Sequence, residues 1–122
     1  GYDWADNDTN VIPDMTKPEG STHGTHVAGT VAANGFIKGV APQAQLLAEK
    51  VFSDESKYAY SDDIVAAIIH AINLEADVIN MSLGSVAGFV NIDDPEQHAI
   101  KLAVDAGIIV AVSAGNSSYS TS

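Results

Sequence analysis

Two short motifs, far apart in the chain, carry the residues that could do chemistry. HGTHVAG at residues 23–29 places a histidine at the entrance of a small-residue helix. SAGN at residues 113–116 places a side-chain amide directly after an apolar segment. A histidine can accept and return a proton, and an amide can donate a hydrogen bond to a developing negative charge. Together they form two of the parts that acyl transfer requires.

Each of these residues also has a structural interpretation. His23 is expected in the first helical turn, where the helix dipole disfavours a positive imidazole, and this suits a general base that is neutral near pH 7. The alternative is a structural histidine, since Gly24, Ala28 and Gly29 allow close packing of the helix backbone. Asn116 likewise has a turn as its alternative, because an Asn often follows a Gly where a strand ends.

Metal binding is a weaker interpretation of the same region. His23 and His26 are three residues apart, but no convincing third ligand follows and the Glu of a zincin motif is absent. Residues 6–17 begin like a calcium loop with Asp6, Asp8 and Asn10. Val11 then stands where that loop needs glycine, and Lys17 stands where it needs a bidentate Glu. We therefore expect no metal in this chain.

The composition excludes several classes of function. The chain has 122 residues, enough for one domain or part of one, with 16 acidic residues against 5 basic ones and a net charge of -11. Such a chain repels phosphate backbones, so we expect no nucleic-acid partner. It has no cysteine, and no apolar run approaches the length of a membrane span. It opens on Gly1 with neither an initiator Met nor a signal peptide, so we expect it to begin within a longer protein.

Apolar segments alternate with helical patterns along the chain. After a short strand and a surface loop in residues 1–22, we expect a helix from His23 to about Asn34, capped by Ser21 or Thr22 and stopped by Gly35. Buried strands are expected at Leu46 to Phe52, Val78 to Leu83 and Ile108 to Val112. Further helices begin at Ser61-Asp62-Asp63 and at Asp93 or Asp94 with Pro95, the second ending at Gly107. His70 and His98 fall within these helices as surface or boundary residues.

Strands that are apolar on both faces and alternate with helices predict a three-layer α/β fold. Its parallel sheet would be covered by helices on both faces. In such sheets, sites gather at the carboxyl ends of the strands, and 82–84 and 113–116 both lie at such ends.

Four motifs in this order resemble the subtilisin-like serine proteases: HGTHVAG, GVAP at residues 39–42, VINMSLGS at 78–85 and SAGNS at 113–117. The opening GYDWADND and a tight turn at residues 34–39 are most similar to the large secreted Gram-positive branch of minor extracellular and cell-envelope proteinases. The resemblance covers nearly the whole chain. It implies a subtilisin-like fold, polypeptide substrates and a location outside the cell or in the cell envelope.

The resemblance also implies a role for each matched residue. His23 would be the general base, and Asn116 would supply the oxyanion-hole side chain. The segment 56–58 would pair with the substrate backbone as an added strand. The walls of the primary specificity pocket would be Ser82, Leu83 and Gly84 on one side and Ser113, Ala114 and Gly115 on the other. The substrate-pairing segment would consist of Ser56, Lys57 and Tyr58. Phe52 and Tyr60 would line an outer apolar subsite.

Two family motifs do not occur in this chain. The catalytic Asp of the family lies in D-[ST]-G and its nucleophile in G-T-S-[MA], and neither string is present. Ser82 is a pocket residue by its motif and is not assigned as the nucleophile. We therefore expect residues 1–122 to be an internal fragment of a peptidase domain that is inactive alone. A catalytically dead peptide-binding module is the alternative, and a zinc hydrolase built on His23 and His26 ranks far behind.

Two further expectations concern calcium and self-association. The loop at residues 34–39 is too short to wrap the calcium ion that the family usually holds there, although the full-length protein can hold calcium elsewhere.

In the family fold, the strand carrying the catalytic Asp lies between the strands that match 46–52 and 78–83. That strand is absent here, so we expect an incomplete sheet with two open edges, and an isolated chain that self-associates.

Overall fold

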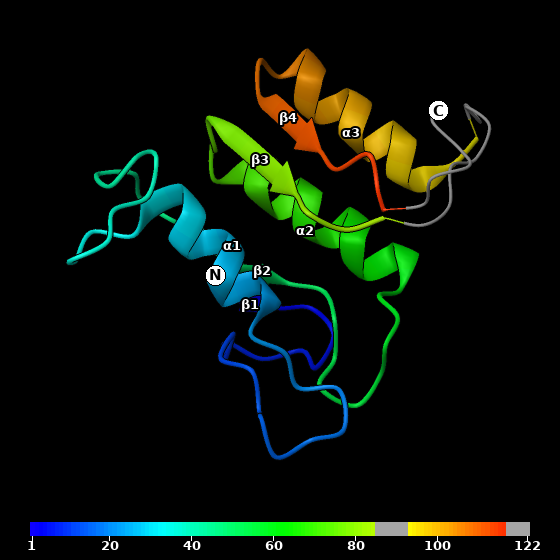
Figure 1. Ribbon diagram of the computed structural model, residues 1–122. Helices are drawn as coiled ribbons and strands as arrows, with labels where there is room; N and C mark the ends of the chain where they lie inside the picture. Colours follow the sequence, from blue (N-terminus) through cyan, green and yellow to red (C-terminus); the bar gives the residue numbers. More distant parts are fainter. Residues whose placement is uncertain (85–92, 117–122) are drawn as a thin grey trace. The chain divides into compact units, whose positions relative to one another are not determined.

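The structure is a computed structural model that describes residues 1–84 and 93–116 (Figure 1). The chain divides into two compact units, Gly1–Tyr60 and Ser61–Ser122. The described residues contain, in chain order, β1 (Tyr2–Asp3), α1 (His23–Ala32), β2 (Glu49–Lys50), α2 (Ser61–Asn73), β3 (Val78–Met81), α3 (Pro95–Asp105) and β4 (Ile109–Val112). None of these helices is long and apolar enough to cross a membrane.

The first unit contains a short parallel ladder between β1 and β2. Tyr2 lies opposite Glu49, and Asp3 lies opposite Lys50. The backbone N–H of Trp4 extends the ladder by donating to the carbonyl of Lys50 at 2.8 Å. Because the two strands come from opposite ends of this unit, the ladder brings the N-terminus alongside the segment that follows residue 48.

The strand expected over residues 46–52 is correct in place but wrong in length. Only Glu49–Lys50 pairs with β1, which is itself two residues long. The reason is that the chain folds back directly after β1, where Asp3 and Asp8 exchange backbone hydrogen bonds of 2.9 and 3.1 Å. Leu46, at the start of the expected segment, lies outside the described strands and is 51% exposed, and Phe52, at its end, forms an isolated antiparallel bridge with Ala59.

α1 begins at His23 as predicted and ends at Ala32, two residues before the expected end. The chain then makes the expected tight turn, in which Asn34 and Lys38 form an antiparallel bridge. Gly39 packs against the helix backbone, and a Cβ there would lie 2.6 Å from the nitrogen of Ala32. A glycine is therefore required at this close approach.

The second unit is built on the parallel pair β3 and β4 (Figure 1). The register runs from Val78 opposite Ile109 to Met81 opposite Val112. The crossover between the two strands passes through α3, which packs against β4 and against α2. This is the connection that a parallel strand pair requires.

Both helices of this unit begin where the sequence predicts. α2 starts at Ser61 with two acidic residues in its first turn, a favourable charge at a helix N-terminus. The sequence left open whether Asp93 or Asp94 begins α3. Asp94 is the N-cap, and its side chain accepts a 2.9 Å hydrogen bond from the N–H of Glu96. Pro95 follows at the first helical position, and Gly107, directly after the C-cap residue Ala106, has a φ of 87°.

The helix faces that pack together are small and apolar. Ala99 and Ala103 on α3 are almost fully buried, at 1% and 0% exposure. The other buried side chains of this unit are Ile64, Ala67, Ile68 and Ala71 on α2, with Met81 and Ile108. Alanines at the contact allow the two helices to approach closely.

The strands are apolar as predicted, and several of their side chains are exposed. Val78, Ile109 and Val112 are 56, 67 and 55% exposed. In the register of the sheet Val78 and Ile109 lie side by side on one face, and Val112 lies on the other face beside the buried Met81. Each unit has its own described strand pair, β1-β2 in the first and β3-β4 in the second.

Candidate functional site

His23 is the first residue of α1, and its side chain is exposed. Its backbone N–H donates to the hydroxyl of Ser21 at 3.2 Å, which satisfies one of the N–H groups left open at a helix start. Thr22 occupies the N-cap position but makes no side-chain capping bond. The helix start therefore fixes the backbone of His23 while its imidazole remains accessible for proton transfer.

The segments 82–84 and 113–115 lie side by side just beyond β3 and β4. The N–H of Ser113 donates to the carbonyl of Met81 at 3.1 Å, and its hydroxyl donates to the carbonyl of Leu83 at 2.9 Å. These bonds continue the strand pairing past the last strand residues. They bring together, at the carboxyl edge of the sheet, the two segments that the resemblance assigns as pocket walls.

Asn116 follows this edge after a turn. Gly115 has a φ of 82°, a conformation that glycine adopts without strain.

The hydroxyl of Ser82 accepts a 2.8 Å hydrogen bond from the side-chain amide of Asn80, two residues earlier in the chain. Ser85 and Ser117, the last residues of two motifs, lie outside the described residues.

The segment expected to pair with substrate forms a closed loop. An antiparallel bridge joins Phe52 to Ala59, so residues 53–58 project between them. The loop is stiffened locally because the N–H of Tyr58 donates to the hydroxyl of Ser56 at 3.2 Å. The apolar side chains expected in the outer subsite are accessible, with Phe52 42% and Tyr60 68% exposed.

Three carboxylates surround the ammonium of Lys50, an arrangement that the sequence analysis missed. Lys50 Nζ lies 2.6 Å from Asp3 Oδ2, 3.3 Å from Asp6 Oδ2 and 3.5 Å from Asp54 Oδ2. The side chains of Lys50 and Asp3 are only 13 and 3% exposed. Burial works to lower the pKa of Lys50, but the hydrogen bonds to Asp3 and Asp6 outweigh it, so the pKa is raised above its usual value.

A sequence signal for this cluster exists in hindsight. Lys50 follows Glu49 within a mostly apolar segment, and a buried ammonium needs a carboxylate partner. Asp54 follows four residues later, and an acidic run lies at the opposite end of the unit. The pairing partner of the strand could not be deduced from this pattern, so neither could the cluster.

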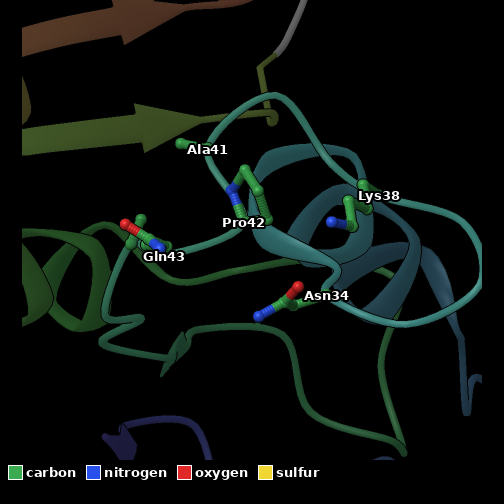
Figure 2. A pocket seen from close by; sticks show the side chains of 6 residues that line it. Asn34, Lys38, Ala41, Pro42 and Gln43 are labelled. Atoms are coloured by element: carbon green, nitrogen blue, oxygen red, sulfur yellow. The ribbon is translucent and has the colours of Figure 1, made fainter.

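Two pockets in the described part of the chain are lined by residues other than His23 and Asn116. The first, of about 330 Å³, is formed by the turn after α1 and is lined by Asn34, Lys38, Ala41, Pro42, Gln43 and Ala44 (Figure 2). The second, of about 520 Å³, lies within the second unit beside the start of α2 and Pro95. Among residues 1–84 and 93–116, no group of three or more acidic residues or histidines is arranged to hold a metal ion.

The two residues expected to carry catalysis belong to different units. His23 lies in Gly1–Tyr60, and Asn116 lies in Ser61–Ser122. Each is described within its own unit, so the expectation that they face one cleft stays a prediction. The same holds for the functional roles of the pocket-wall and substrate-pairing residues.

Comparison with known families decides what kind of domain this is. The sequence model described as the subtilase family matches residues 1–122, the whole chain. The chain belongs to the subtilase family. The predicted subtilisin-like α/β fold is supported in the same way by a solved structure, the prenylagaramide maturation protease PagA, with a TM-score of 0.71 at 34% identity over 80% of this chain and 36% of that one.

Curated relatives include proteinases of the branch that the motifs resemble. The PI-type proteinase of Lactococcus lactis subsp. cremoris is 43% identical over 131 residues, covering 100% of this chain and 7% of the relative. Minor extracellular protease Vpr of Bacillus subtilis (strain 168) is 42% identical over 120 residues, covering 96% and 14%. The Major intracellular serine protease of the same strain is 45% identical over 98 residues, covering 77% and 29%. The subtilase chain thus spans less than a third of these curated relatives.

Proposed function

We propose that the whole protein containing this subtilase chain is a serine endopeptidase. The observation that carries the proposal is the family match over all 122 residues, together with relatives that are named as proteinases. Peptide-bond hydrolysis in such an enzyme requires a nucleophile, a base that takes its proton and donors for the oxyanion. This chain would supply the base and one of the oxyanion donors.

In this mechanism His23 is the general base. It takes the proton of a serine hydroxyl as the serine attacks the peptide carbonyl, and it returns the proton to the leaving amine. Its accessible position at a fixed helix start supports the assignment, because a general base must come within hydrogen-bond reach of the attacking group. The serine and the aspartate of the triad are assigned to parts of the whole protein other than residues 1–122.

Asn116 donates its side-chain amide to the negative oxygen that forms during attack. Its support is its place at the carboxyl edge of the β3-β4 sheet, next to the paired segments 82–84 and 113–115. Those segments form the walls of the pocket for the side chain before the cleaved bond.

The proposed substrate is an extended polypeptide. The loop of residues 53–58 adds a strand to it through the backbone of Ser56, Lys57 and Tyr58, and Phe52 and Tyr60 line an outer apolar subsite. The exposure of the two aromatic rings supports contact with substrate side chains. No calcium is assigned to the turn after α1, since a bridge between Asn34 and Lys38 closes it after a few residues.

We extend the proposal to location and place the whole protein outside the cell or in the cell envelope. Support comes from the relative named as a minor extracellular protease. The relative named as intracellular is equally similar, so identity alone does not decide the compartment. Assay of the culture medium, the cell wall and the cytoplasm for the protein tests this part, and a cytoplasmic pool alone would contradict it.

The activity is tested by labelling with a serine-directed fluorophosphonate. The whole protein should be labelled and should hydrolyse peptides. His23→Ala should remove both properties and leave the melting temperature nearly unchanged, because the imidazole is exposed. Residues 1–122 alone should not react, since the G-T-S nucleophile motif does not occur in them.

Two outcomes would contradict the proposal. Stoichiometric labelling of residues 1–122 alone would place a nucleophile in this chain and overturn the assignment. A whole protein that binds peptides but neither reacts with the probe nor cleaves would instead be the catalytically dead peptide-binding module.

A further inference from the structure

Asp54 connects the loop of residues 53–58 to the segment that leads into α1. Its carboxylate oxygen Oδ2 accepts a hydrogen bond from the backbone N–H of Asp14 at 3.0 Å. Its backbone carbonyl accepts a second bond from the N–H of Glu19, also at 3.0 Å. The residue therefore holds both ends of the turn formed by residues 14–19, which lies directly before the start of α1.

The same carboxylate is tied to the sheet of the first unit. Asp54 Oδ2 lies 3.5 Å from Lys50 Nζ, and that ammonium also pairs with Asp3 and Asp6 on the N-terminal side. The hydroxyl of Ser53 donates to Asp6 at 3.2 Å, beside this pair. With its side chain only 14% exposed, Asp54 is shielded from water, so its interactions are screened less than those at the surface.

Two further ion pairs join the same segments but are exposed. Lys17 and Glu55 meet at 2.7 Å with 46 and 59% of their side chains exposed. Lys57 and Glu19 lie 3.9 Å apart, with Lys57 72% exposed. Exposed ion pairs of this kind contribute little to the stability of the folded state. The half-buried Asp54 is thus the main connection between the two segments.

The turn that Asp54 holds is stiff and continues into the helix. The N–H of Lys17 donates to the carbonyl of Asp14 at 3.1 Å, and the N–H of Gly20 donates to Lys17 at 3.3 Å. Gly20 lies so close to Asp14 that a Cβ there would be 2.2 Å from its carbonyl oxygen. Only Ser21 and Thr22 then separate this turn from His23. The position of the turn therefore constrains the position of the start of α1.

We propose that Asp54 is a positioning residue that fixes the substrate-pairing loop relative to the helix start carrying His23. The inference rests on the proposed function. A peptide that adds as a strand along Ser56, Lys57 and Tyr58 must deliver its cleaved bond to a base on another segment. Asp54 sets the register between the two by bonding to both. A substrate too short to reach the loop does not use this connection.

The experiment compares two substrates in the whole protein. One is an N-acylated single-residue p-nitroanilide, and the other is a peptide p-nitroanilide with four residues before the cleaved bond. For Asp54→Ala we expect kcat/KM to fall about tenfold for the long substrate and less than about twofold for the short one, because small displacements of a positioning segment have large effects on rate. Asp54→Asn keeps an oxygen for the N–H of Asp14 but loses the ion pair, so it should fall between Asp54→Ala and wild type.

A matched control is Asp105→Ala, which removes an exposed ion pair with Lys101 on α3, with Nζ and Oδ2 2.6 Å apart. It should leave kcat/KM unchanged for both substrates. If Asp54→Ala does not fold, Asp54→Asn and Lys50→Met carry the test, and each should lower the ratio of long-substrate to short-substrate kcat/KM.

The possible contrary results are distinguishable. An equal loss for both substrates would show that Asp54 only supports folding, and no loss for either would show that the loop is positioned by other contacts. Both would overturn the inference while the protease activity stands. A wild-type protein that cleaves neither substrate would overturn the proposed function and this inference with it.

Discussion

Asn116 is positioned by the backbone that precedes it. β4 ends at Val112, Ser113 is held by two hydrogen bonds to the chain beyond β3, and Gly115 then turns the backbone. A donor that is held before charge develops needs little reorganisation during the reaction. Under the proposed function this fixed backbone carries the oxyanion-hole side chain, which leads to a specific kinetic prediction.

Replacing Asn116 with Leu in the whole protein should lower kcat and leave KM nearly unchanged. The amide acts on the negative oxygen of the transition state rather than on the bound peptide, so about 10²–10³-fold is expected, the loss measured when subtilisin itself loses such a donor. Steady-state kinetics with the long substrate measures both constants. Asn73→Leu, at the end of α2, is the matched control and should change neither. A raised KM with unchanged kcat would assign Asn116 to ground-state binding.

The ammonium of Lys50 keeps its charge throughout the neutral range. The pKa of Lys50 is raised above the ordinary value of 10.5 because its hydrogen bonds to Asp3 and Asp6 outweigh the effect of burial. A raised lysine pKa means that its stabilising contribution is complete below pH 10.5 and is lost only as the pH rises through the higher, folded-state value. The ammonium that pairs with Asp54 is therefore charged throughout the neutral range.

At the scale of elements, the start of α3 shows how a short polar signal determines a boundary. Asp94 has extended backbone angles, with φ -72° and ψ 118°, and its carboxylate accepts from the N–H of Glu96. Pro95 is preorganised for the first helical position and needs no hydrogen-bond partner for a backbone N–H. The capping bond satisfies one of the N–H groups that every helix start leaves open.

Removing this cap should destabilise the unit that contains α3. Asp94→Ala is expected to cost about 1 kcal/mol, the usual value for loss of an N-cap side chain. Urea unfolding of the whole protein measures it as a lower midpoint with an unchanged slope. Asp94→Asn keeps an acceptor oxygen and is the control that should retain most of the stability. If the two variants were equally destabilised, the charge of Asp94 rather than its capping bond would be responsible.

Helices were predictable from sequence because their signals are local. The start of α2 carries acidic residues and its apolar side chains recur at helical spacing, and α3 is delimited by Asp94 and Gly107. The strands were predictable in place because their apolar runs follow the helices. Their lengths were not, since the extent of β2 depends on a partner strand that folds back after Asp3, nearly fifty residues away.

The site was predictable only where a motif or a strand end marks it. The pairing of 82–84 with 113–115 follows from two parallel strands ending at one edge, and the structure has it. The Lys50 cluster joins residues from both ends of the first unit, and charge patterns carry no information on such distant pairing. The roles of His23 and Asn116 come from the family resemblance and remain predictions.

At the scale of the whole molecule, the described strands form two parallel pairs, β1 with β2 in the first unit and β3 with β4 in the second. Each pair of strands has backbone groups along its outer edges, and edges of this kind readily pair with another chain. The exposed apolar side chains of β3 and β4 strengthen this tendency.

Residues 1–122, produced alone, should therefore self-associate. Unpaired edges and more than half-exposed Val78, Ile109 and Val112 favour strand addition between copies. Light scattering coupled to size exclusion should show a mass above that of the 12.6 kDa monomer, rising with concentration. Val78→Lys places a charge on β3 and should reduce association, since a strand that presents lysine resists pairing with another copy. Val104→Lys makes the same change on α3 and should reduce it less. A monomeric mass with one cooperative unfolding transition would show that the edges are protected within the chain.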